Sequence, residues 1–227
     1  MAIWHWIGYC VCHQMPDRTL VVGGRMLPVC ARCSGMYLGF VLALLLQLAG
    51  NRGRFRIGVP PVWVAVIAAL GMGVMAFDGV SSYAGWRTTT NDIRLVTGSL
   101  TGAAVAVVLP ALVGYALCSE SNLRGRRLWA PLYLVVLWLP AVVLPWILPR
   151  MPDWLGWLGP VAGSLGITAM WTLVNSAMFG VLLRSEPRGR RSLGNPAVVG
   201  LSLCAAIAEL TFAHWLHYAM YHAIGLA

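Results

Sequence analysis

The stretch from Pro28 to Gly50, PVCARCSGMYLGFVLALLLQLAG, joins a pair of cysteines to the first long apolar run of the chain. A helix needs about 20 mainly apolar residues to cross a bilayer. The run from Gly35 to Gly50 therefore predicts a short membrane-spanning helix. Ser34 is a residue type favoured as a helix N-cap, so we expect the pair Cys30-x-x-Cys33 at the mouth of that helix.

Five further runs extend this pattern, and they are Val59–Phe77, Leu95–Leu117, Leu128–Leu148, Pro160–Leu183 and Pro196–Ile224. The chain is 59% apolar and only 10% charged, far below the quarter of charged residues in soluble domains. The sequence thus predicts an all-α integral membrane protein with about six transmembrane helices. We expect one polytopic domain over residues 1–227, with a Cys/His segment at 1–34 and the helix bundle at 35–227.

The basic residues are all arginine, and their distribution predicts the orientation. Most follow the first, third and fifth runs: Arg52, Arg54, Arg56, Arg124, Arg126, Arg127, Arg184, Arg188, Arg190 and Arg191. The positive-inside rule makes that side cytoplasmic. We expect a multi-pass protein of the cytoplasmic membrane with both termini and the cysteine segment on the extracytoplasmic face. The net charge of +9 does not indicate nucleic-acid binding, because no DNA- or RNA-binding module is visible.

The cysteine segment has the spacing of a small metal site. Cys10, Cys12 and His13 precede Cys30 and Cys33 by a gap typical of zinc-binding pairs. Cys30 and Cys33 would supply two of the four ligands that zinc prefers, and the rest would come from the first group or from a more distant histidine. Gly23 and Gly24 permit the tight turn that would bring the two groups together.

Three alternative roles for these cysteines stay open. A CxxC pair at a helix start, with Arg32 inside it, would have lowered thiol pKa values, as a thiol–disulfide oxidoreductase coupled to a membrane quinone would need. Structural disulfides are permitted in an oxidising outer compartment. The thiols could also be reduced packing residues, as we expect for Cys118 and Cys204.

A second candidate site lies between the second and third runs. Asp78 is a candidate base, and Arg87, Asn91 and Arg94 are candidates for binding an anionic group together with Arg18. The structural alternative is that Thr90 or Asn91 caps the third helix and Asp92 complements its positive end. Gly98 and Gly102 would then form a small-residue packing face.

The last run carries Glu209, His214, His217 and His222. A carboxyl group deep in a span is costly unless it is paired or hydrated, so Glu209 is a catalytic candidate together with His217. Histidines near a membrane interface also serve as anchors.

Two stretches of the chain, CHQMPDRTL and PVCARCSGMYLGF, resemble the motif of DUF2085, a family of prokaryotic integral membrane proteins of unknown function. The resemblance favours Cys12, Cys30 and Cys33 as metal ligands, with His13 as a fourth. It implies no established activity.

The leading functional expectation is a metal site, expected to hold zinc, beside an Arg/Asp/His pocket in a hydrolase or transferase that acts on a lipid-linked or amphipathic anionic substrate. The quinone-coupled oxidoreductase is the first alternative, and a proton-coupled transporter using Glu209 and His217 is the second. Membrane lipids are the expected partners, and the sequence identifies no protein partner.

Overall fold

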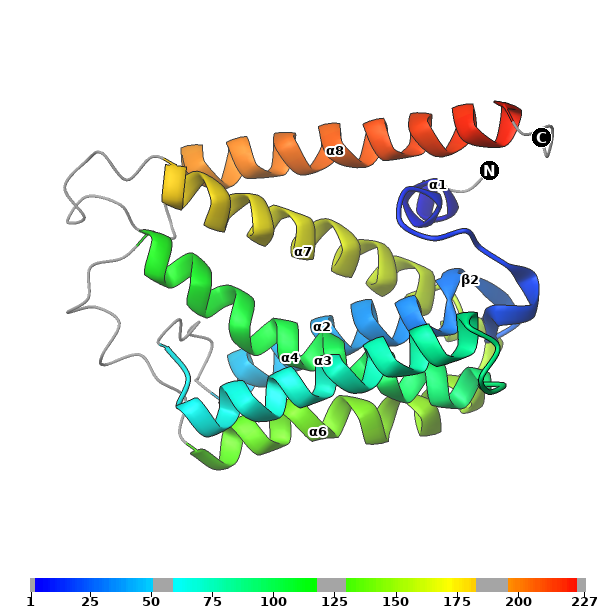
Figure 1. Cartoon of the computed structure of the whole chain (residues 1–227), viewed down its shortest axis with the longest axis horizontal. Helices are drawn as coiled ribbons and strands as arrows, with labels where there is room; N and C mark the ends of the chain where they lie inside the picture. Colours follow the sequence, from blue (N-terminus) through cyan, green and yellow to red (C-terminus); the bar gives the residue numbers. More distant parts are fainter. Residues whose placement is uncertain (1–2, 51–58, 118–129, 183–195, 224–227) are drawn as a thin grey trace.

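The computed structural model describes residues 3–50, 59–117, 130–182 and 196–223. Within these ranges six helices are long and apolar enough to cross a membrane. They are α2 (Ala31–Gly50), α3 (Val62–Tyr83), α4 (Asn91–Leu117), α6 (Ala130–Ile147), α7 (Leu158–Leu182) and α8 (Pro196–Ala223). The predicted all-α membrane fold is confirmed, and Figure 1 shows the six helices running roughly along one long direction.

The small elements gather at one end of the bundle (Figure 1). They are the helix α1 (Ile3–Tyr9), the 3-10 turn η1 (Pro16–Arg18) and the strands β1 (Thr19–Val22) and β2 (Arg25–Cys30). We call this the cysteine end, and both chain termini lie there. The ten arginines that predict the orientation all fall outside the described residues, so the side of the membrane that the cysteine end faces stays a prediction.

Helix α4 lies at the centre of the bundle and packs backbone to backbone against α2. A Cβ atom on Gly98 would lie 2.1 Å from the carbonyl oxygen of Arg32, and one on Gly102 would lie 2.0 Å from that of Met36. Gly35 of α2 approaches α4 equally closely, since its Cβ would lie 2.3 Å from the Leu95 carbonyl oxygen. Small residues at such positions allow membrane helices to approach closely, which confirms the predicted packing face.

The N-terminal segment folds over the start of α2. Gly23 and Gly24 have φ values of 50° and 66°, which only glycine adopts readily, and their turn joins β1 to β2 in an antiparallel hairpin. Gln14, with φ 52°, then ties the segment together. Its side-chain amide donates to the carbonyl oxygens of His5 and Pro28, both at 2.7 Å.

Two expected helix boundaries were wrong. Helix α2 begins at Ala31 rather than after Ser34, and the Ser34 hydroxyl donates to the Val29 carbonyl oxygen at 3.0 Å instead of capping the helix. Helix α3 continues to Tyr83, so Asp78 lies inside a helix and not in a connecting loop. The charge is accommodated in the helix because arginines from other segments pair with it.

The close α2–α4 contact predicts that a single added methyl group at Gly102 is destabilising. The Gly102→Ala variant should lose about 2 kcal/mol of unfolding free energy, because neither backbone can withdraw without separating the helices. Thermal melting in detergent measures this loss. The matched control is Gly73→Ala on α3, where an added Cβ meets nothing within 4 Å, and equal melting temperatures for the two variants would contradict the prediction.

Candidate functional site

Three cysteine thiols converge at the cysteine end. The Sγ atoms of Cys12, Cys30 and Cys33 all lie within 4.8 Å of one another. Cys12 follows α1, Cys30 ends β2, and Cys33 lies in the first turn of α2. The hairpin turn at Gly23 and Gly24 therefore brings Cys12 to the CxxC pair, as the sequence predicted.

The local hydrogen bonds favour a thiolate at this point. The Cys12 and Cys33 thiols, together with backbone N–H groups of Cys33 and Arg32, lower the pKa of Cys30 to about 2. The pKa of Cys12 is raised, first because its thiol donates to Cys30. The Cys30 backbone N–H in turn lies 3.3 Å from the Cys12 sulfur and donates to it. The hydrogen bonds around Cys30 thus favour its thiolate form.

Cys10 lies outside this three-sulfur group. Its thiol donates to the Trp6 carbonyl oxygen at 3.3 Å, and burial raises its pKa to about 11. Cys204 is exposed on α8, and Cys118 lies outside the described residues. The geometry therefore selects the same three cysteines that the motif favours.

The thiol group opens into a cavity of about 170 Å³. Besides the three cysteines, the cavity is lined by Val11, His13, Gln14, Met15, Arg18, Arg32 and Tyr83. Arg18 also lies over the Tyr83 ring, with its guanidinium carbon 5.4 Å from the ring centroid. The open side of the sulfur group therefore faces two arginines, which makes the cavity favourable for an anion.

The donor set fits a soft or borderline divalent cation. Zn–S bonds of about 2.3 Å in a tetrahedron place sulfur atoms about 3.8 Å apart, and the three sulfurs need little movement to reach this spacing. Thiolate ligands select zinc, copper(I) or iron–sulfur chemistry over magnesium and calcium. His13 lines the cavity but is not part of the three-sulfur group, so its role as a fourth ligand stays a prediction.

Asp78 lies at the centre of an ionic network beside this cavity. Its side chain is only 1% exposed. One carboxylate oxygen accepts from Arg32 Nε at 3.0 Å and from Arg32 Nη2, and the other accepts from Arg87 and from Thr89 at 2.9 Å. Because both oxygens are occupied, this geometry favours a structural role that joins α2, α3 and the connection to α4. A role as a catalytic base stays a prediction.

The candidate anion-binding residues separate into two groups. Arg18 lines the cavity and also lies 3.5 Å from Asp17. Asn91 donates to the Asp17 carbonyl oxygen at 3.3 Å and accepts from Arg94 at 3.0 Å. Of the four, the cavity-lining residues therefore include Arg18 but not Arg87, Asn91 or Arg94. Thr90 caps α4 by accepting from the Ile93 N–H at 3.3 Å.

The polar residues of α8 lie at two different distances from the cysteine end. His217 Nδ1 lies 2.8 Å from the Tyr9 carbonyl oxygen, and the His217 ring lies 5.2 Å from that of His13. The His214 ring is stacked on Trp6. Glu209 lies about 12 Å further along the helix from His217, at 1.5 Å per residue, and accepts from Asn175 of α7 at 2.9 Å. The structure thus brings His217 beside the cavity segment and leaves Glu209 within an interhelical pair.

The sequence placed Arg32 beside the cysteines as a group that lowers their thiol pKa values, but it did not predict that Arg32 pairs with Asp78 or that Tyr83 and Gln14 line the cavity. The position of Arg32 between the two cysteines was the signal for its place at the site. Tyr83 and Gln14 gave none, since their roles depend on how distant segments pack.

Comparison with known proteins supports the family resemblance. Residues 12–108 match the family model DUF2085, described as a predicted membrane protein. An uncharacterized protein of Methanocaldococcus jannaschii is 33% identical over 116 residues, which cover 47% of this chain and 71% of the relative. One from Methanothermobacter thermautotrophicus is 34% identical over 103 residues, or 45% and 86% of the two chains. No solved structure matches the chain.

The Asp78 network predicts a large loss of stability when its one acid is neutralised. The Asp78→Asn variant should unfold more easily by roughly 3 kcal/mol, because removal of one partner leaves buried charge unpaired. Asp92→Asn, which removes an exposed acid from the first turn of α4, should change the melting temperature little. An Asp78→Asn protein as stable as the wild type would contradict the structural role.

Proposed function

Because the chain belongs to the DUF2085 family of predicted membrane proteins, whose description names no activity, we propose a function from the site itself. Cys12, Cys30 and Cys33 would hold a metal ion without His13 as a fourth ligand, and Arg18 and Arg32 would bind an anionic group beside the ion in the same cavity. The observation that carries this proposal is the shared cavity, which brings the three sulfurs together with Arg18 and Arg32.

Charge balance supports the choice of ligand. Three thiolates around a divalent ion would leave one net negative charge, and Arg18 and Arg32 line the same cavity. Arg32 is held in place by Asp78, so its guanidinium group is oriented before any ligand arrives. A metal site with three protein ligands and one open position is typical of catalytic zinc.

A zinc ion in this position supplies a Lewis acid that polarises an oxygen atom. The protein's own residues then have separate tasks. Arg18 and Arg32 bind and orient the anionic group, Tyr83 positions Arg18, and the hairpin excludes water from one side of the sulfur group. His217 would orient the His13 ring at the cavity. Its own Nδ1 contacts the Tyr9 carbonyl oxygen, and its ring packs against that of His13.

The location of the cavity indicates an amphipathic substrate. The cavity lies where α2 begins, so its ligands meet the bundle at the end of a membrane span. We infer transfer or hydrolysis on a lipid-linked anionic substrate, at the extracytoplasmic face of the cytoplasmic membrane. Asp78 and Glu209 take structural roles in this scheme, since other side chains already occupy their carboxylates.

One observation favours a second candidate, a quinone-coupled thiol–disulfide oxidoreductase. The lowered pKa of Cys30 is the property that such an enzyme requires of its attacking thiol. In this scheme Cys30 and Cys33 would cycle between thiol and disulfide, and no metal would be retained.

The two candidates predict different metal contents. Protein purified without chelator should hold about one zinc per chain, and Cys12→Ser, Cys30→Ser and Cys33→Ser should each lower this content severalfold because each removes a ligand. Metal analysis combined with thiol titration measures the change. Cys10→Ser is the matched control, since Cys10 lies in the same segment but outside the three-sulfur group, and it should keep the metal. Metal-free protein with a reducible Cys30–Cys33 bond would overturn the metal site in favour of the oxidoreductase.

A further inference from the structure

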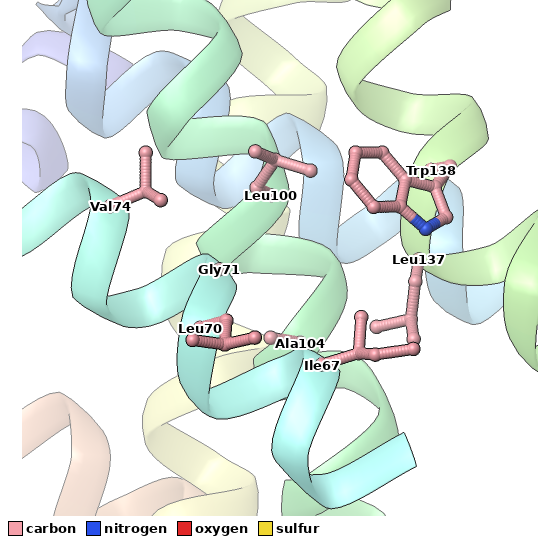
Figure 2. A pocket seen from close by; sticks show the side chains of 8 residues that line it. All are labelled: Ile67, Leu70, Gly71, Val74, Leu100, Ala104, Leu137 and Trp138. Atoms are coloured by element: carbon pink, nitrogen blue, oxygen red, sulfur yellow. The ribbon is translucent and has the colours of Figure 1, made fainter. Parts of the chain in front are cut away.

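An apolar groove lies between three helices of the bundle (Figure 2), and none of its lining residues lines the cysteine cavity. It has a volume of about 170 Å³ and is formed by α3, α4 and α6. Its lining residues are Ile67, Leu70, Gly71, Val74, Leu100, Ala104, Leu137 and Trp138. In Figure 2 the Trp138 ring lies on the α6 side, beside Leu100 and across from Val74.

Small residues create the hollow and large exposed ones border it. Gly71 and Ala104 contribute almost no side chain, and a Cβ atom on Gly71 would come no closer than 3.6 Å to Leu100. Leu70 is 64% exposed and Trp138 is 52% exposed. In a protein that spans a bilayer these exposed side chains face lipid, so the groove is accessible from the hydrocarbon core.

The groove follows one face of α3 towards the cysteine end. Ile67, Leu70 and Val74 recur at helical spacing, and Phe77 continues the same face one turn later. From Ile67 to Val74 the helix rises about 10 Å at 1.5 Å per residue, which is about a third of the hydrocarbon thickness. The groove thus fits a segment of one extended chain lying along the helix.

Arg87 lies near Phe77, at the end of this face of α3. The Arg87 guanidinium carbon is 5.8 Å from the centroid of the Phe77 ring, and the Arg87 side chain is 36% exposed. Its partner Asp78 is shared with Arg32, so the network of two arginines and one aspartate keeps one net positive charge. This charge favours a phosphate at the level where α3 ends.

Helix α6 forms another wall of the groove, and it too ends near an arginine that lies over an aromatic ring. Helix α6 carries Trp138 in its middle and Trp146 near its end, and Arg150 lies 4.9 Å from the Trp146 ring. Both walls therefore end in an arginine that lies over an aromatic ring at the same end of the bundle, where lipid headgroups lie relative to their chains.

We propose that this groove is a binding site for one anionic glycerophospholipid, with an acyl chain in the groove and its phosphate at Arg87. The lipid is a bound component of the protein and not the substrate of the cysteine cavity. Neither the groove nor Arg87 lines that cavity, so the inference stands whether or not the metal site holds.

Photolabelling in lipid nanodiscs tests the proposal. The full-length protein is placed in phosphatidylcholine that contains a small fraction of phosphatidylglycerol with a diazirine in its acyl chain, and labelled residues are mapped by mass spectrometry. Labelling should concentrate on Leu70, Leu100 and Trp138. Unlabelled phosphatidylglycerol should lower it at least fivefold, and added phosphatidylcholine should not.

Two glycines on α3 supply matched variants. Gly71→Leu fills the groove and should lower this labelling severalfold, whereas Gly73→Leu, whose Cβ meets nothing within 4 Å, should leave it unchanged. Leu70→Trp is a second variant that fills the same groove. The melting temperatures of the variants show whether they fold. Labelling that does not saturate, or that spreads over α3 in proportion to exposure, would show bulk bilayer lipid and overturn the proposal. Equal competition by phosphatidylcholine would overturn the anionic headgroup.

Discussion

The backbone contact between α2 and α4 is the constraint on which the cysteine end depends. Gly98 approaches the carbonyl oxygen of Arg32, the residue between Cys30 and Cys33. The helix turn that carries the CxxC pair is therefore fixed against the central helix of the bundle, with no side chain between the two backbones. A site built on a turn held this tightly can keep its sulfur atoms in place without a disulfide.

The same contact positions the ionic network. Arg32 leaves the α2 backbone at the point where α4 packs against it and reaches Asp78 on α3. Asp78 also binds Arg87 and Thr89 from the connection to α4. Two membrane-spanning helices and the connection to a third are thus joined by one carboxylate beside the cysteine cavity. The network has one net positive charge, which its two arginines share.

The six spans were predictable because each is a long apolar run and a bilayer leaves few alternatives to a helix. The spacing of the cysteines predicted a metal site but left part of its ligand set open among Cys10, Cys12 and His13, and the family motif narrowed the cysteines to Cys12, Cys30 and Cys33. The hairpin turn was predictable from two consecutive glycines. The extension of α3 through Asp78 was not, because a charge normally marks the end of a span and its partner Arg32 lies 46 residues away. The cavity and groove also escaped prediction, since both depend on which helices are neighbours. The predicted orientation rests on arginines outside the described residues.

X-ray absorption spectroscopy at the metal edge of the purified protein tests the open three-cysteine metal site directly. We expect three sulfur neighbours at about 2.3 Å and one oxygen neighbour, without the multiple scattering of a coordinated imidazole. Four protein ligands, seen as a fourth sulfur or as an imidazole from His13, would close the site and contradict an open position facing the arginines.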